Sequence, residues 1–138
     1  MKCVLNVGGN SKDIAIPDYY NGWRHDLLDI DPNTSAEIIC DGRNLTSLKA
    51  ESYDSVYCSH NLEHYHPHET YQVLMGFKHV LKSDGFAEIK VPDVMSVMRF
   101  AIQNNLDFND ILYNSAAGPI KVHDVIYGWG AEIERSNN

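Results

Sequence analysis

The sequence predicts an α/β fold built on a mainly parallel sheet, and three features carry this prediction. The run CVLNVGGN at residues 3–10 has the nearly unbroken apolar character of a strand that is covered on both faces. It ends at Gly8-Gly9, a bend that suits the carboxyl end of a strand, where open α/β sheets bind their ligands. In the second half of the chain, strand-like and helical patterns alternate over residues 53–102.

Composition bounds the class of protein. The 138 residues are long enough for one domain with its own core. A net charge of −8 without any basic run argues against nucleic acid or an anionic membrane surface as the main partner. We find no signal peptide, and no apolar run approaches the ~18 residues of a membrane span. The three cysteines have no paired spacing and predict free, buried thiols in a reducing cytoplasm: Cys3, Cys40 and Cys58.

The first half of the chain predicts strands with little helix between them. Residues 10–23 have no sustained helical period and read as a loop with at most one helical turn. The second strand is expected over residues 25–31 and the third over 37–41, followed by at most a short helix over 45–51. About six residues join strands two and three, whereas parallel neighbours usually need a dozen or more. An extended link of that length reaches ~20 Å, so a parallel crossover and an antiparallel hairpin both remain open.

The second half predicts strand, helix, strand and helix in turn. A fourth strand is expected over residues 53–59, and the clearest helix over 67–82 with Pro67 at its first position. One face of that helix is apolar, and Gly85 suits a left-handed cap behind it. A fifth strand is expected over 86–91.

Asp93 is placed to cap a second helix, running from Val94 to about Asn104. This helix is expected to bury one face: Val94, Val97, Met98, Ala101 and Ile102. From Leu106 onward the pattern fades, and no further strand is predicted.

Polar residues and glycines follow the carboxyl ends of four predicted strands: Gly8-Gly9, Asp29 or Asp31, Asp41-Gly42 and Ser59-His60. In a parallel sheet these ends rim one crevice. An acid about 20 residues after the glycine bend is placed to accept hydrogen bonds from ribose hydroxyls. The G-x-G-x-x-G fingerprint is absent, and no helix begins behind the glycines to hold a pyrophosphate. The pattern therefore indicates a nucleoside cofactor without phosphates.

Five segments in this order resemble the motifs of the class I S-adenosylmethionine-dependent methyltransferases, in particular the type 11 group. They are LNVGGN at 5–10, LLDIDP at 27–32, CDGRNL at 40–45, YDSVYCSHNLEH at 53–64 and VLKSDGFAEIKVPD at 80–93. The resemblance implies a Rossmann-like sheet of about five strands in the order 3-2-1-4-5. It also implies methyl transfer from S-adenosyl-L-methionine, with S-adenosyl-L-homocysteine as product, to an unidentified acceptor, expected to be a small molecule.

The resemblance also implies roles for particular residues. Asp29 would bind the ribose, Asp41 the adenine amine, and His60 would lie near the methionine part. His60 and His64 are the candidates for a general base. The full cofactor-binding set is Gly8, Gly9, Asn10, Asp29, Asp41, Gly42, Ser59 and His60. The substrate face would include Tyr65 and parts of 115–130, with His123, Tyr127 and Trp129; accordingly Asp29→Ala is expected to weaken S-adenosylmethionine binding and Trp129→Ala to spare it.

The chain departs from the family pattern at several points. Asn6 replaces the usual acid and Asn10 the second glycine, and the helices after strands one and two are reduced. The chain ends before the sixth and seventh strands of the family, so residues 1–138 are expected to be one C-terminally truncated domain. Strand five would then be an open edge, shielded by residues 106–138 or by a second copy in a homodimer.

Two other functions remain open. The missing strands favour a non-catalytic cofactor-binding or scaffold module on a degenerate methyltransferase fold. More remotely, His60-x-x-Glu63-His64 matches the H-x-x-E-H pattern of inverted zinc peptidases. That pattern needs a helix, whereas here it follows a strand and Pro67 limits any helix through it. No metal site is therefore predicted: Glu63 and His64 are expected to be structural, and His66 and His68 solvated.

Overall fold

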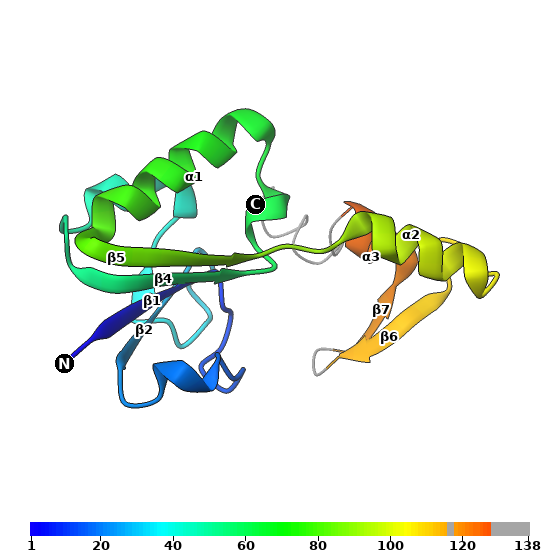
Figure 1. The fold of residues 1–138 in the computed structure, drawn as a ribbon, viewed down its shortest axis with the longest axis horizontal. Coiled ribbons are helices and arrows are strands. Elements are labelled where there is room, and N and C mark those ends of the chain that lie inside the picture. Colours follow the sequence, from blue (N-terminus) through cyan, green and yellow to red (C-terminus); the bar gives the residue numbers. More distant parts are fainter. Residues whose placement is uncertain (116–117, 128–138) are drawn as a thin grey trace. The chain divides into compact units, whose positions relative to one another are not determined.

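The computed structural model describes residues 1–115 and 118–127, and the chain divides between Val91 and Pro92 into two compact units (Figure 1). The expectation of a single domain stays a prediction. The first unit contains β1 (Cys3–Val7), the 3-10 turn η1 (Asp18–Tyr20), β2 (Arg24–Asp29), β3 (Ile38–Ile39), the 3-10 segment η2 (Gly42–Ser47), β4 (Tyr53–Ser59), the 3-10 turn η3 (Leu62–His64), α1 (Pro67–Val80) and β5 (Leu81–Lys90). The second contains α2 (Val94–Gln103), β6 (Ile111–Ser115), β7 (Gly118–Lys121) and α3 (Val122–Tyr127).

The first unit is built on a five-stranded parallel sheet in the order β3-β2-β1-β4-β5. This confirms the predicted fold class and strand order. Leu28 of β2 pairs with Ile38 of β3 in parallel register, so the hairpin alternative for these two strands is wrong. The third strand is shorter than predicted: only two residues, Ile38 and Ile39, pair with the end of β2.

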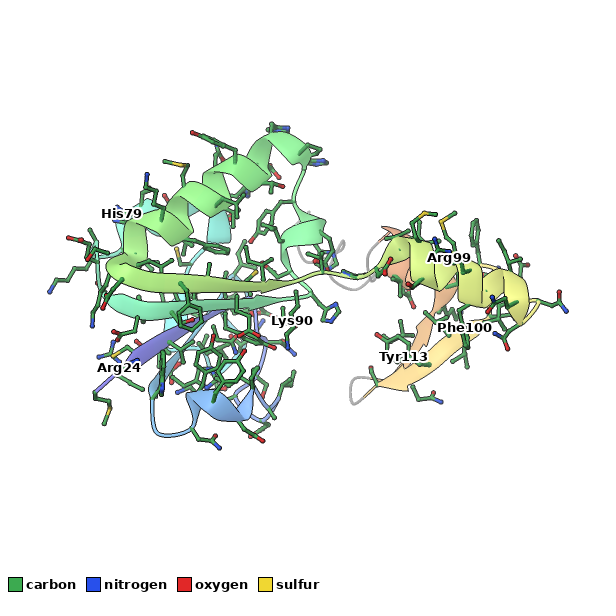
Figure 2. All side chains as sticks on the ribbon, in the orientation of Figure 1. Arg24, His79, Lys90, Arg99, Phe100 and Tyr113 are labelled. Carbon is green, nitrogen blue, oxygen red and sulfur yellow. The ribbon has the colours of Figure 1, made fainter. Side chains whose placement is uncertain are left out.

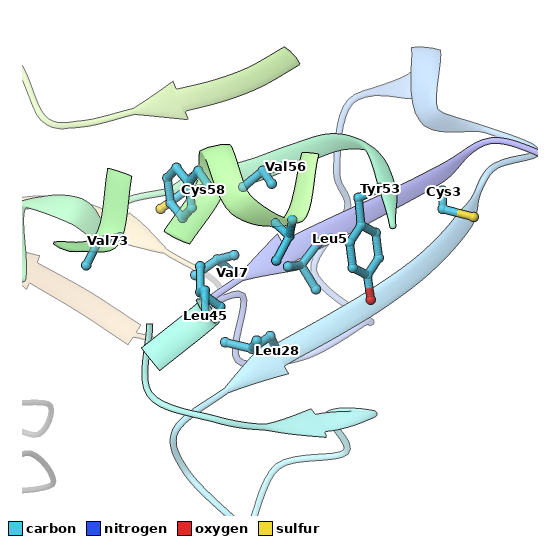
Figure 3. Packing of buried hydrophobic residues seen from close by; sticks show 11 residues of the cluster. Cys3, Leu5, Val7, Leu28, Leu45, Tyr53, Val56, Cys58 and Val73 are labelled. Carbon is cyan, nitrogen blue, oxygen red and sulfur yellow. The ribbon is translucent and has the colours of Figure 1, made fainter. Parts of the chain in front are cut away.

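One face of the sheet carries the main core, formed with α1 and η2 (Figure 3). Val73, Phe77 and Val80 of α1 pack on Leu5 and Val56 of the central strands, and each is at most 2% exposed. Burying a side chain of this kind stabilises the fold by about 1.5–3 kcal/mol. As predicted, the thiols of Cys3, Cys40 and Cys58 are free, although Cys40 is only partly buried.

The opposite face is covered by the loop after β1, which confirms a loop with a single helical turn at this place. Tyr20 of η1 is 3% exposed and packs on Val4 and Tyr57, with Trp23 beside it. The Tyr20 hydroxyl lies 2.9 Å from Ser55 Oγ and donates to Glu88 Oε2 at 3.0 Å. The large aromatic side chains of Tyr20 and Trp23 thus cover this face of the sheet in place of a helix, and the hydroxyl of Tyr20 is hydrogen-bonded.

The junction between α1 and β5 differs from the prediction. Pro67 takes the first helical position, as expected, but α1 ends at Val80 and the chain enters β5 at once. Gly85 lies inside β5 and is not a left-handed cap. A Cβ at Gly85 would lie 3.0 Å from the Asp54 carbonyl oxygen, beside a shift in register between β4 and β5. The glycine therefore serves a close approach of two strands at a bulge.

In the described part of the chain, β5 pairs only with β4, and no further strand extends this sheet. Its outer edge carries exposed apolar side chains, among them Phe86 and Ile89. Pairing of two copies through this edge stays a prediction. No helix among the described residues has the length and apolarity needed to cross a membrane.

Two expectations for the second unit are wrong. Asp93 does cap α2, accepting the Ser96 N–H at 3.1 Å, but of the predicted face only Ala101 is buried, while Met98 and Ile102 are 45% and 76% exposed. The apolar face of this ten-residue helix needs a broad partner surface, and among the described residues of this unit the hairpin and α3 are too small to supply it. That hairpin, formed by β6 and β7, is the second correction, since no strand was predicted after residue 106.

At the amino ends of β1, β4 and β5, the Asp54 carboxylate joins the three strands. Asp54 Oδ2 accepts the Cys3 N–H at 2.9 Å, and Lys82 Nζ lies 3.1 Å away. The Cys3 N–H and then Lys82 lower the pKa of Asp54, so its stabilisation is present near neutral pH and is lost as the pH falls through that lowered pKa. Asp54→Asn should therefore lower the midpoint of urea unfolding at about pH 7 and lower it by a smaller amount at about pH 3.

The matched control is Asp84→Asn, which replaces an exposed aspartate of β5. It should leave the midpoint nearly unchanged at both pH values. An Asp54→Asn midpoint that falls by the same amount at both pH values would contradict the electrostatic link.

Candidate functional site

All five strands of the sheet run in the same direction, so their carboxyl ends lie together along one side of the sheet, which we call its carboxyl edge. Lys90, at the end of β5, marks this edge, and Arg24, at the start of β2, marks the opposite, amino edge (Figure 2). Each predicted cofactor residue is the last residue of a strand or lies within three residues after it. Because the strands are parallel and adjacent, the structure brings these residues to the same edge: Gly8, Gly9, Asn10, Asp29, Asp41, Gly42, Ser59 and His60.

The glycine bend is held by close contacts on both sides. Gly8 has φ +73° and its N–H donates to the Leu28 carbonyl at 2.8 Å. A Cβ at Gly8 would overlap the side-chain amide of Asn61, and a Cβ at Gly9 would overlap that of Asn6. Two asparagine amides thus line the bend. The backbone of Gly8 and Gly9 lies so close to them that a residue with a Cβ does not fit at either position.

Asp29 ties the bend to the ends of β2 and β3. Its side chain is 9% exposed. Oδ2 accepts the Asn10 N–H and Oδ1 the Asp31 N–H, each at 3.0 Å, while its backbone carbonyl accepts the Cys40 N–H at 3.0 Å. Each carboxylate oxygen keeps a second acceptor position for a ligand hydroxyl. The Asp31 side chain instead accepts the Asn33 N–H at 2.9 Å in its own turn. Of the two predicted acids, Asp29 is therefore the one beside the bend.

Asp41 is bound differently, because Arg43 occupies its carboxylate. Oδ1 accepts the Arg43 backbone N–H at 2.9 Å, and the guanidinium donates to both oxygens at 2.6–3.1 Å. Arg43 lowers the pKa of Asp41 through these hydrogen bonds, and its Nη1 also donates to Glu69 Oε1 at 2.8 Å. The acceptor positions of Asp41 are thus engaged, and its role toward an adenine amine stays a prediction.

Gly42 is buried beneath Tyr65. A Cβ at Gly42 would overlap the Tyr65 hydroxyl and would contact Val7 at 3.8 Å. Burial, and then the negative charge of Asp41, raise the pKa of Tyr65, so this phenol stays protonated over the physiological range. The residue predicted for the substrate face therefore packs beside the end of β1.

The two histidines proposed as bases lie on a turn at the surface. His60 has φ +52°, is exposed, and donates its backbone N–H to the Lys90 carbonyl at 2.9 Å, next to the half-buried Ser59. His64 Nε2 lies 3.7 Å from Glu63 Oε1, and His66 and His68 are exposed.

The zinc-peptidase pattern does not form the helix that it needs. After His60 the chain makes only the 3-10 turn η3 and then an extended residue, Tyr65, before α1 begins at Pro67. Within residues 1–115 and 118–127, no group of three or more His, Cys, Asp or Glu side chains could hold a metal ion.

The remaining substrate residues belong to the second unit. His123 lies in α3, with Nδ1 3.3 Å from Asp124 Oδ1. Trp129 and the side chain of Tyr127 lie outside the described residues, so the expectation for Trp129→Ala stays untested.

Sequence reasoning missed three residues around the bend: Arg43, Asn61 and His25. The Asp41-Gly42-Arg43 order at a helical start does carry a signal, because an aspartate at an N-cap accepts a backbone N–H two residues on. Asn61 carries none, since its contact with Gly8 depends on β1 and β4 being neighbours. His25 matters through Asn6, whose Nδ2 lies 3.2 Å from its Nε2.

Comparison with solved structures identifies the fold. A SAM-dependent methyltransferase from Archaeoglobus fulgidus superposes with a TM-score of 0.58 and 20% identity, covering 77% of this chain and 53% of that chain. The PH0226 protein from Pyrococcus horikoshii OT3 superposes with a TM-score of 0.56 and 19% identity, covering 80% and 57%. This chain thus spans a little over half the length of each. No family model and no curated protein matches the sequence.

Strand order, the position of the glycine bend and these superpositions agree. The chain has the Rossmann-like fold of the class I methyltransferases.

Proposed function

We propose that this chain binds S-adenosyl-L-methionine at the carboxyl edge of its sheet and is the core of an S-adenosylmethionine-dependent methyltransferase. The observation that carries the proposal is the Asp29 carboxylate, which joins the glycine bend to the end of β2 and keeps two acceptor positions. A ribose offers two neighbouring hydroxyl donors of the kind that such a carboxylate binds.

The residues at this edge fit such a cofactor in part. Gly8 and Gly9 allow the close approach of backbone that a nucleoside and its amino-acid part need, with Asn10, Ser59 and His60 along the rim. Asp41 fits less well, because a ligand amine would have to compete with Arg43 for its oxygens. Asp29 and the bend are therefore the stronger half of the proposed site.

Bound S-adenosylmethionine supplies a methyl group that its sulfonium already activates. The protein's contribution is then chiefly to bind and align, which is an entropic gain. A base is required only for an acceptor that must lose a proton. His60 at the rim and His64 beside Glu63 remain the candidates, and the acceptor that we propose is a small molecule.

Titration calorimetry of the purified chain with S-adenosylmethionine and S-adenosylhomocysteine tests the proposal. We expect saturable binding of both at one site per chain. Absence of heat and of any thermal stabilisation with either compound would contradict it, and metal analysis of the same sample would show whether a zinc-dependent function should be reconsidered.

The second candidate function is a non-catalytic cofactor-binding or scaffold module. It is favoured by the Asp41 carboxylate, whose oxygens Arg43 engages, so that an adenine amine would have to displace the guanidinium. Binding of S-adenosylhomocysteine without methyl transfer to any of a panel of small-molecule acceptors would favour this candidate over an enzyme.

A further inference from the structure

The glycine bend rests on the side chain of Asn6. This residue of β1 is 3% exposed, although its neighbours in the strand are apolar. An ideal Cβ at Gly9 would lie 2.6 Å from Asn6 Oδ1 and 2.7 Å from its Cγ. The Gly9 backbone is therefore seated directly on the Asn6 amide, and in a close-packed interior a displacement of this amide must move the bend, while a half-turn of the amide changes the polar atom that faces it.

The Asn6 amide is in turn held by His25 of β2. Asn6 Nδ2 and His25 Nε2 lie 3.2 Å apart. With the amide placed in this way its nitrogen donates, so Nε2 accepts and the imidazole is neutral with its proton on Nδ1. A histidine thus lies two contacts away from the backbone that would receive the cofactor.

The surroundings of His25 favour this neutral form. Burial has the largest influence and lowers the pKa of the ring, and the charge of Lys12 lowers it further. Glu37 and Asp26 act in the opposite direction. Lys12 forms an ion pair with Glu37, so these two charges partly cancel at the ring and burial decides the direction.

We propose that His25 is a positioning residue, which through Asn6 keeps the Gly8–Asn10 bend in its ligand-binding geometry only while its ring is neutral. The part of this proposal that concerns the cofactor rests on the proposed function. A protonated ring has two N–H donors and no acceptor, so it cannot accept from Asn6 Nδ2. The amide must then turn over or separate, beneath a loop whose next N–H, from Asn10, binds Asp29.

The sign of the pH dependence follows from the direction of the pKa. Because burial lowers the pKa, the ring stays neutral at physiological pH and is protonated only below the ordinary histidine range. Cofactor affinity should therefore be constant at neutral pH and fall as the pH drops through the pKa of His25.

Nuclear magnetic resonance of the ligand-free chain tests the positioning role directly. The Gly9 backbone amide and the Asn6 side-chain amide should shift with pH at one midpoint, shared with the His25 ring and below the ordinary histidine value of about 6.5. In His25→Gln, whose amide oxygen can accept but does not titrate, both signals should stay constant. The control variant is His79→Gln, which removes a histidine at the carboxyl end of α1. In this variant the Gly9 and Asn6 signals should shift with pH as they do in the wild type.

A Gly9 signal that does not respond to pH in the wild type, or that titrates unchanged in His25→Gln, would overturn the proposal. The wild-type titration decides even if the variant does not fold.

Calorimetry with S-adenosylhomocysteine forms the second arm. The wild type should lose about fivefold in affinity on passing to the acidic side of the midpoint, the equivalent of one hydrogen bond, whereas His25→Gln should not. If the affinity of the wild type for S-adenosylhomocysteine were the same on both sides of the His25 midpoint, the ring would not control cofactor binding. Absence of binding at every pH would refute the proposed function alone, because the resonance experiment judges His25 without any ligand.

Discussion

Replacement of Asp29 by alanine should lower the affinity for S-adenosylmethionine by about 100- to 10,000-fold. Two hydrogen bonds from ribose hydroxyls to a carboxylate are worth about 1.5–3 kcal/mol each, and every 1.4 kcal/mol is tenfold in affinity. The loss of the Asn10 N–H partner adds to this effect, because the bend is then no longer tied to β2. Titration calorimetry at neutral pH measures the change.

Asp31→Ala is the matched control, since Asp31 is an acid two residues away whose carboxylate accepts from Asn33. It should keep the affinity within a few-fold of the wild type. Comparable losses in the two variants would contradict the assignment of Asp29. Urea unfolding of both variants must accompany the binding data, because Asp29 is buried and also holds two backbone N–H groups.

Replacement of Gly8 by alanine should both destabilise the fold and abolish measurable cofactor binding. The left-handed backbone alone costs a residue with a Cβ about 1–2 kcal/mol. In addition, the new Cβ would lie 2.5 Å from Asn61 Cγ, so the bend or Asn61 must move. We expect a total loss of about 3 kcal/mol in the free energy of unfolding, since a forced repacking adds typically 1–3 kcal/mol to the backbone term.

Gly22 provides the control for backbone strain without contact. It has φ +84°, similar to the +73° of Gly8, but nothing lies within 4 Å of the position of its Cβ. Gly22→Ala should therefore cost only about 1–2 kcal/mol and leave binding intact.

The contact itself is tested by combining Gly8→Ala with Asn61→Ala. The double variant should be more stable than the sum of the two single losses, because the overlapping amide has been removed. Equal costs for Gly8→Ala and Gly22→Ala, with additive behaviour in the double variant, would show that Asn61 does not restrict the bend.

Much of the fold could be predicted from the sequence, because it rests on local patterns. Apolar runs bounded by glycine, proline and aspartate mark strands, and Pro67 and Asp93 mark helix starts in their expected positions. The failures lie where a local signal competes with packing. Gly85 is a good helix cap in the sequence, yet the structure pairs residues 81–90 with β4, so the chain passes directly from α1 into β5. In α2, apolar spacing predicts a buried face, yet burial also needs a facing surface, and Met98 stays exposed.

The candidate site shows the same division. Residue types at strand ends could be placed at one edge, since parallel neighbouring strands end together. Their contacts could not. That Arg43 engages Asp41, or that Asn61 meets Gly8, depends on which side chains from separate segments reach the same atoms. The distinction between Asp29 and Asp31 likewise appears only when the Asn10 N–H is seen to donate to Asp29.

By itself, then, the sequence determined the strands and helices up to the end of α2 and placed the predicted cofactor residues near strand ends, because each depends on periodicity and chain direction within a few residues. Only the tertiary structure decided which groups hold the bend. The pairing of β1 with β2 places His25 against Asn6, and that of β1 with β4 brings Asn61 toward Gly8. These are contacts between segments 19 to 53 residues apart, and their chemistry arises from proximity that no local pattern encodes.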